Sequence, residues 1–235
     1  MNEQEKQEIL SSAKSFFRAR IAQNHIKNTE KLADLSNFNV NPFLSKYLAQ
    51  FAFGNSSPES IAKALIYPRV LGTSITTSFG TNMQYFCKDV LSSYASTTSG
   101  IDIEFVDALD GRRKYCQVKA GPNTINKDDV ATITGHFRGI RSLARTNGLP
   151  LQLTDCVVGV FYGTSASLSQ FYKEIDRDYP VYVGRQFWYH LTGDQDFYED
   201  LISAYAEVAD EMDSSALLHQ TVEKLAHALT QTQNG

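Results

Sequence analysis

The sequence predicts an α/β fold in which helices surround a small central sheet. Three observations lead to this prediction. Apolar residues at three-to-four spacing predict a helix from residue 3 to about residue 30. Asp110-Gly111 lies between two β-rich runs and is a strong hairpin signal. The continuous apolar, β-branched run over residues 156–162 is typical of a strand that is buried on both faces.

Most of the remaining elements are helices. Ser57-Pro58 marks the start of one, because proline suits the first helical turn, and we expect Pro68 to end it. Asn126 starts another, with acidic residues in its first turn, and Asn147-Gly148 ends it. A short strand is predicted over 181–183. The other predicted helices span about 43–51, 81–94, 185–192, 196–212 and 214–231.

The predicted hairpin sorts its side chains into a polar and an apolar face. A two-residue type I′ turn at Asp110-Gly111 fixes the register, since Leu109 then faces Arg112. Side chains alternate along a strand, so each strand contributes every second residue to one face. The polar face pairs Asp102 with Lys119 and Glu104 with Gln117. The other face pairs Ile103 with Val118, Phe105 with Cys116 and Asp107 with Lys114, and is apolar enough to pack.

The polar face has the layout of a metal-dependent phosphodiesterase site. Mg²⁺ takes oxygen ligands and keeps several waters, so Asp102 and Gln117 are candidate ligands. Glu104, opposite Gln117, can make up part of the charge that the neutral amide lacks. Lys119 can orient water and offset phosphate charge, and its closeness to a carboxylate favours this electrostatic role over that of a general base. The alternative is an exposed Asp–Lys pair of about 1 kcal/mol or less.

These residues resemble the motif of the PD-(D/E)XK nuclease superfamily, which has an acid on one strand and acid-x-lysine on the next. The tail over residues 119–126, Lys-Ala-Gly-Pro-Asn-Thr-Ile-Asn, is similar to that of type II restriction endonucleases. Segments 41–43, 68–72 and 157–163 resemble those of enzymes that cut interrupted GG-N-CC-type sites. The resemblance spans roughly residues 40 to 190. Gln117 departs from it, because the superfamily usually has Asp or Glu there.

The resemblance implies a restriction-endonuclease-like core, a mixed central sheet flanked by helices, with helical additions at both ends. We expect one nuclease domain over 1–235, with a helical region over 1–55, a catalytic core over 56–190 and C-terminal helices over 191–235. The α-β-β-β-α-β order of that core leaves one strand unaccounted for, which either lies within 70–77 or is too short to recognise. The implied activity is Mg²⁺-dependent, site-specific hydrolysis of double-stranded DNA that leaves 5′-phosphate and 3′-hydroxyl ends.

Several residues beyond the motif are candidates for DNA contact. The helix that follows the site carries arginines three and four residues apart, which share a face and suit guanine or phosphate recognition; a solvated basic stripe is the alternative. Backbone N–H groups at its start can hold a phosphate, although the polar residues there also suit capping. His136 is interpreted as structural and Gln84 as a surface residue rather than a second amide ligand. The candidates are Asn123, Thr124, Asn126, Lys127, Arg138, Arg141 and Arg145.

Composition fits a soluble, cytoplasmic protein whose charge is unevenly distributed. The net charge is −4, but residues 111–150 hold eight Lys/Arg against two Asp, and residues 191–235 hold nine Asp/Glu against one Lys. A basic segment beside the site can supply phosphate contacts, and the alternative is that both charged segments are solvated helix faces. Apolar runs are too short for a transmembrane helix, no secretory signal is recognised, and three scattered cysteines indicate reduced thiols.

Two other functions stay open at this stage. One is a repair or recombination nuclease of the same superfamily, such as a junction resolvase. The other is a catalytically inactive DNA-binding protein on the same core, which Gln117 favours. For the restriction enzyme we predict a homodimer, because two copies related by a two-fold axis cut a palindrome symmetrically. The helices over 185–231, or the N-terminal helix, are the candidate contacts. We also predict that Gln117→Glu retains or raises activity.

Overall fold

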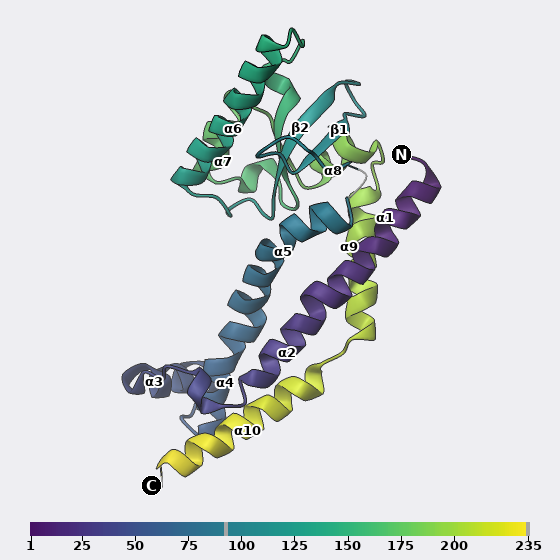
Figure 1. The fold of residues 1–235 in the computed structure, drawn as a ribbon. Coiled ribbons are helices and arrows are strands. Elements are labelled where there is room, and N and C mark those ends of the chain that lie inside the picture. The colour runs from purple at the N-terminus through teal and green to yellow at the C-terminus, as the bar shows by residue number, and fades with distance from the viewer. Residues whose placement is uncertain (92–93, 234–235) are drawn as a thin grey trace. The chain divides into compact units, whose positions relative to one another are not determined.

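The computed structural model describes residues 1–91 and 94–233, apart from the side chains of Gln84 and Gln233. The chain divides into two compact units, each assembled from separate stretches of sequence (Figure 1). The boundaries predicted at residues 55 and 190 do not coincide with these units, and a single domain over 1–235 stays a prediction. Unit 1 comprises Met1–Phe16 and Gly80–Ala206, and unit 2 comprises Phe17–Phe79 and Glu207–Gly235.

Unit 1 contains a mixed sheet whose strand order is β1-β2-β3-β4. β1 and β2 are antiparallel, whereas β2, β3 and β4 run parallel to one another. The sheet is flanked by helices, which confirms the predicted fold class. The bounds are β1 (Ile103–Val106), β2 (Arg113–Lys119), β3 (Cys156–Val160) and β4 (Val181–Val183).

Helices cover both faces of this sheet (Figure 1). α6 (Lys127–Thr146) and α7 (Gln170–Ile175) pack on the face formed by Val158 and Val160, and their buried side chains include Phe137 and Tyr172. α8 (Arg185–Thr192) packs on the other face, where a Cβ added to Gly159 would lie 2.3 Å from Phe187. Only glycine therefore allows this close approach. Unit 1 also includes α1 (Glu3–Phe16), most of α5 (Ile75–Asp89) and most of α9 (Phe197–Glu211).

Of two predictions about residues 68–77, one is confirmed and one is wrong. α4 (Pro58–Pro68) ends at Pro68, as predicted. It is followed directly by a π-helix (Arg69–Ser74) and then by α5, so no strand forms over 70–77. Pro68 has a helical φ of −62°, and the Arg69 N–H donates to the Ile66 carbonyl, so the chain continues in a helical conformation past the proline. Among the described residues, the strand that was unaccounted for corresponds to a single bridge between Ala95 and Ile103. The helix expected over 81–94 begins at Ile75 and ends at Asp89, and residues 92–93 lie outside the described part.

Unit 2 is helical. Its core includes Ile61 and Ile66 of α4 and Val222 and Leu225 of α10 (Ser215–Gln233). α3 (Pro42–Phe53) buries Ser45 and Ala49 and leaves its opposite face exposed. The unit also contains a π-helix (Phe17–Ala22), α2 (Gln23–Lys31) and a 3₁₀ turn (Leu35–Asn37), which continue the predicted N-terminal helix; further 3₁₀ turns in unit 1 span Leu153–Asp155 and Ser165–Ser167.

Two compositional predictions can be compared with the structure. Each helix in the described part of the chain is too short or too polar to traverse a lipid bilayer. The three cysteines are unpaired and buried, as expected of reduced thiols.

Candidate active site

The β1–β2 hairpin has a longer loop than predicted. Ile103 pairs with Cys116 and Val106 with Arg113, a register shifted by two residues from the one expected for a two-residue turn. Gly111 takes φ +69°, but no residue other than glycine has positive φ in the described chain, so Asp110 does not adopt the type I′ conformation. The predicted turn and its pairs are therefore wrong. The shift is even, however, so each side chain stays on the face predicted for it.

Carboxylates explain the longer loop. The Asp107 side chain accepts from the Leu109 N–H, and the Asp110 side chain accepts from the Arg112 N–H, at 2.9 Å each. These side-chain hydrogen bonds replace backbone hydrogen bonds that the two strands would have made beside a tighter turn. The Lys114 ammonium, which is fully buried, lies 2.5 Å from Asp110 and 3.9 Å from Asp107. The apolar face of the hairpin thus contains a buried charge at the loop end.

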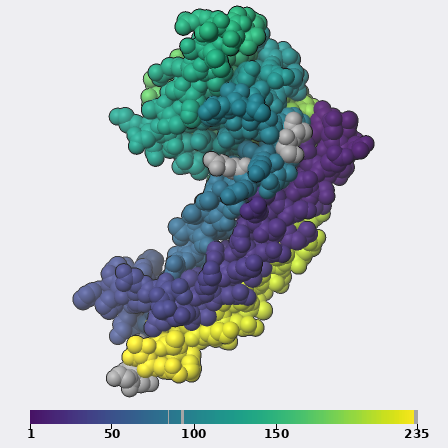
Figure 2. Space-filling model, in the orientation of Figure 1, coloured from purple at the N-terminus to yellow at the C-terminus, as the bar shows by residue number. Residues whose placement is uncertain are grey.

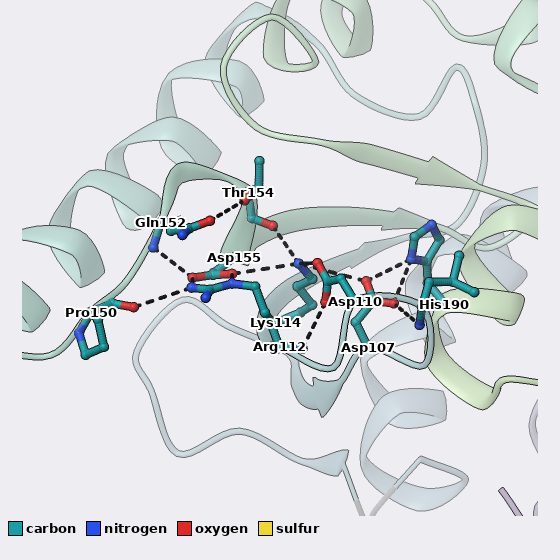
Figure 3. A network of polar contacts seen from close by, with 10 residues as sticks. Asp107, Asp110, Arg112, Lys114, Pro150, Gln152, Thr154, Asp155 and His190 are labelled. Atoms are coloured by element: carbon teal, nitrogen blue, oxygen red, sulfur yellow. Dashed lines mark hydrogen bonds and ion pairs between the residues drawn. The ribbon is translucent and has the colours of Figure 1, made fainter.

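This buried charge belongs to a network that ties the hairpin to the start of β3 (Figure 3). Lys114 donates to the Thr154 carbonyl at 3.1 Å, and Arg112 forms a bidentate pair with buried Asp155. Asp107 also contacts Nδ1 of His190, whose ring stacks on Tyr182 with centroids 3.7 Å apart. Each charge has a partner, so the network fixes the end of β2 that is opposite Lys119.

The other end of β2 opens into a cavity of about 490 Å³. Asp102, Gln117 and Lys119 line it together. α6 supplies the facing wall, and Gly80 and Met83 of α5 also contribute. The remaining lining residues are Gly100, Ile101, Val118, Ala120, Thr124, Asp129, Thr132, Ile133 and His136. The three motif residues therefore meet at one concave site, as the resemblance implies.

Asp102 is held in place by the neighbouring strand. Its N–H donates to the Cys116 carbonyl at 3.0 Å, and its Oδ2 accepts from the Val118 N–H at 2.7 Å. Extending the observed register by one residue places Gln117, not Lys119, opposite Asp102. Burial raises the pKa of Asp102, while the Val118 N–H and the charge of Lys119 act in the opposite direction. The carboxylate is thus desolvated and oriented by a backbone donor.

Gln117 is buried and its amide is fixed by hydrogen bonds. Nε2 contacts the Gly100 carbonyl at 2.6 Å and Nδ1 of His136 at 2.8 Å. A carbonyl oxygen only accepts, so the nitrogen must face Gly100 and Oε1 must lie on the other side. No described residue donates to Oε1, which leaves it available to a ligand in the cavity.

Lys119 and Glu104 have different environments. Lys119 is half-buried in the cavity wall, and no described side chain forms an ion pair with it. Glu104 accepts from Ser96 at 2.6 Å and from Thr98 at 2.9 Å, and it pairs with Arg113 at 3.2 Å. Glu104 faces Tyr115 rather than Gln117 and does not line the cavity. The structure therefore brings Asp102, Gln117 and Lys119 together and separates Glu104 from them.

The predicted DNA contacts before α6 are mostly in capping or turn positions. Asn126 caps α6, accepting from the N–H groups of Asp128 and Asp129 in a capping box. Thr124 lines the cavity and donates to the Gly121 carbonyl at 2.9 Å. Asn123 and Lys127 are exposed. Helix capping explains the role of Asn126. Thr124, Asn123 and Lys127 have exposed surface that a phosphate can reach.

The arginines of α6 line a separate groove. Arg138, Arg141 and Arg145 surround a space of about 340 Å³ together with Leu149, Pro150 and Leu151. They follow His136 by two, five and nine residues. At about 100° per residue, their side chains point roughly 140–200° away from that of His136 around the helix axis. They share a face, as predicted, but it is the flank opposite the cavity. The buried Nε of Arg141 has no hydrogen-bond partner among the described residues.

The donor set of the cavity suits a hard cation with few protein ligands. No group of three or more His, Cys, Asp or Glu side chains is placed to hold a metal ion within residues 1–91 and 94–233. Mg²⁺ commonly takes one or two carboxylates, keeps several waters and binds substrate phosphate. One carboxylate from Asp102 and one amide oxygen from Gln117, with space for water, fit this pattern.

Sequence reasoning underrated His136 and Gly100. His136 lies on the α6 face that also carries Asp129 and Thr132, and this periodicity was the available signal. Gly100, at φ +76°, contributes the carbonyl that binds Gln117, and a residue without a side chain gives no signal of this role in the sequence. The side chain of Gln84 lies outside the described part of the chain, so its interpretation as a surface residue stays a prediction.

Comparison with known proteins identifies one family. The model of the type II restriction endonuclease EcoO109I family matches residues 11–213, which is most of the chain. A comparison with curated proteins finds no match. The matched region includes the whole sheet, the cavity and α6. A mixed sheet flanked by helices, with Asp102, Gln117 and Lys119 at one cavity, agrees with this match. The chain therefore belongs to the type II restriction endonuclease EcoO109I family, whose members are site-specific deoxyribonucleases.

Proposed function

We propose that this enzyme hydrolyses phosphodiester bonds of double-stranded DNA at the Asp102–Gln117–Lys119 cavity with Mg²⁺, leaving 5′-phosphate and 3′-hydroxyl ends. The observation that carries the proposal is the convergence of these three side chains on one cavity. The family membership gives the reaction class. An interrupted GG-N-CC-type palindrome is the proposed class of recognition site.

Each of the three residues has a distinct role in this proposal. Asp102 and the Oε1 of Gln117 hold the cation, which would polarise the phosphate and lower the pKa of a bound water. Lys119 has no competing carboxylate bound to it and contributes positive charge to the phosphate and the attacking water. Glu104, engaged by Ser96 and Thr98, is at most an indirect contributor through its charge.

Incubation with plasmid DNA, with Mg²⁺ or with EDTA, tests the activity. We expect discrete fragments with Mg²⁺ and none with EDTA. A smear, or cleavage of branched DNA alone, would indicate a repair or recombination nuclease instead. Retained DNA binding without cleavage would indicate an inactive binding protein, the function that a glutamine at position 117 favours.

Two substitutions test the site. Asp102→Asn keeps an oxygen that can accept from the Val118 N–H but removes the negative charge. Lys119→Ala removes the side-chain ammonium. We expect each to lower the cleavage rate by about 10²-fold or more without changing the unfolding temperature appreciably. Lys173→Ala, an exposed lysine of α7, is the control. Cleavage at the wild-type rate by either site variant would remove that residue from the proposed mechanism.

We also propose a homodimer, with α3 as the contact. A palindrome is cut symmetrically by two copies related by a two-fold axis. Exposed large apolar side chains share one face of α3, and this part of the chain lies at the surface in Figure 2. Phe43 is 87% and Phe51 78% exposed, with Tyr47 stacked beside Phe51. An isologous pair of such faces would bury them, which makes α3 a stronger candidate than the helices over 185–231 or α1.

A further inference from the structure

The amide of Gln117 is bound by acceptors from two different elements. Nε2 carries two hydrogens, and it has two acceptors within 2.8 Å: the Gly100 carbonyl and Nδ1 of His136 on α6. Gln117 is only 5% exposed, so water does not compete for these bonds. Turning the amide over would set Oε1 against the Gly100 carbonyl oxygen. One orientation is therefore strongly favoured, and it presents Oε1 to the cavity.

The position of the His136 ring is itself defined by Gly100. Gly100 has φ +76°, and a Cβ at this position would lie 2.5 Å from Cγ of His136. The ring thus packs directly on the backbone that also supplies the carbonyl for Gln117. Because the amide nitrogen only donates, Nδ1 of His136 must accept, and a neutral ring then carries its proton on Nε2. Neither ring nitrogen is available as a metal ligand in this arrangement.

We propose that His136 is a positioning residue that acts through Gln117, holding the side-chain amide so that Oε1 faces the divalent cation. The inference rests on the proposed function, because it assigns Oε1 a cation in the cavity. A neutral amide is a weaker ligand than a carboxylate and can swing away, so a fixed orientation matters more for it. Groups that orient a ligand from behind commonly change metal affinity about 10–100-fold when removed.

A matched pair of variants separates positioning from packing. His136→Asn places an amide oxygen near the position of Nδ1 and can still accept from Gln117. His136→Leu fills a similar volume and offers no acceptor. Leucine favours a helix more than asparagine does, so a purely structural role predicts that the leucine variant is the less impaired one. Positioning predicts the opposite order.

Mn²⁺ binding to the free protein, measured by calorimetry, is the first readout, and the Mg²⁺ concentration for half-maximal plasmid cleavage is the second. We expect His136→Leu to weaken Mn²⁺ binding about tenfold or more, and His136→Asn to stay within about threefold of the wild type. Thermal unfolding of both variants is recorded alongside. Wild-type Mn²⁺ binding by His136→Leu, or equal losses in both variants, would overturn the inference.

A double-mutant cycle tests whether His136 acts through Gln117. In a Gln117→Ala background, His136→Leu should cause no further loss of Mn²⁺ binding, because the group that it orients is gone. The same loss in both backgrounds would assign His136 an independent role and overturn the inference. If the cycle behaves as expected while the wild type cuts no DNA, the positioning stands and the nuclease proposal falls. A wild type that binds no Mn²⁺ in the cavity overturns the inference, whatever the plasmid result.

Discussion

Position 117 is occupied by a residue that can donate and accept at once, and the structure uses its donor capacity. Nε2 makes two hydrogen bonds, and no described residue donates to Oε1 of this cavity-lining side chain. A carboxylate could serve the cation but could not donate to the Gly100 carbonyl. The environment of the side chain therefore matches an amide, even though the resemblance leads one to expect an acid here.

This environment changes the expectation for Gln117→Glu. From the motif alone the variant was predicted to retain or raise activity. In the structure, a glutamate oxygen would replace the nitrogen that lies 2.6 Å from the Gly100 carbonyl, and the two oxygens would repel each other. We now expect at least a tenfold rise in the Mg²⁺ concentration for half-maximal cleavage, about 1.4 kcal/mol in cation binding. Activity at or above wild type at low Mg²⁺ would restore the earlier prediction.

At the scale of elements, strand β2 connects the buried ion-pair network at one of its ends with the cavity at its other end. Lys114, near its start, belongs to the ion-pair network with Arg112 and Asp155, and its last residue, Lys119, lines the cavity. Burial alone would raise the pKa of Asp155. The hydrogen bonds from Arg112 and the Gln152 N–H, and the charges of Arg112 and Lys114, outweigh burial and hold the pKa below its ordinary value of 3.8.

The lowered pKa of Asp155 has a definite sign for stability. The ionised network stabilises the fold above the unfolded-state pKa, and this contribution is lost as pH falls through the lower folded-state value. We expect Asp155→Asn to reduce the free energy of unfolding by about 3 kcal/mol at pH 7. The difference from the wild type should shrink below about pH 4. Asp178→Asn, at an exposed position, is the control for denaturant unfolding at each pH. A difference that grows on acidification would contradict the network's role.

The two flanks of α6 have different proposed functions: one lines the cavity and the other carries the arginine groove. Asp129, Thr132 and His136 face the cavity, and the arginine groove lies on the other flank. Arg141→Ala is expected to weaken DNA binding for cognate and unrelated duplexes alike, and to reduce the slope of log affinity against log salt by about 1. Cleavage at saturating DNA should change little.

Arg177→Ala, an exposed arginine outside the groove, is the control for this salt titration. An unchanged slope for Arg141→Ala would show that the groove does not contact DNA. A loss confined to the cognate duplex would instead indicate base recognition by this side chain.

A comparison of single elements shows which features could be predicted from the sequence alone. The capping signals of α6, the buried run of β3 and the two faces of the hairpin are local patterns, and the structure confirms them. The hairpin register was wrong because Asp107 and Asp110 bind backbone N–H groups, which a turn rule based on the Asp-Gly dipeptide does not include. Asp102, Gln117 and Lys119 converge nevertheless, since a two-residue shift preserves the face.

At the scale of the whole molecule, contacts between segments that are far apart in the sequence were not predicted. α4 and α10 share a core, although most of unit 1 separates them along the chain. No periodicity within either helix indicates its partner. The role of His136 has the same origin, because its contact with Gln117 depends on how α6 packs on the sheet.

The homodimer is tested at this scale. We expect the wild type to scatter light as a dimer at micromolar concentration, and the double variant Phe43→Ser with Phe51→Ser to scatter as a monomer, because the exposed face of α3 loses its two most exposed rings. Ile202→Ser, which is 53% exposed on α9, tests the C-terminal helices instead. A monomeric wild type that accumulates nicked circles before linear DNA would refute the dimer.

The discontinuous units have a consequence for synthesis of the chain. During synthesis α4 emerges early, but its apolar partners on α10 emerge only after all of unit 1 has been made. Until then, Ile61 and Ile66 lack the surface against which they pack in the finished protein. Unit 2 can form its core only once α10 has been synthesised. If α3 joins two copies, pairing also has to wait, so a half-made chain cannot yet assemble into a symmetric DNA-cutting pair.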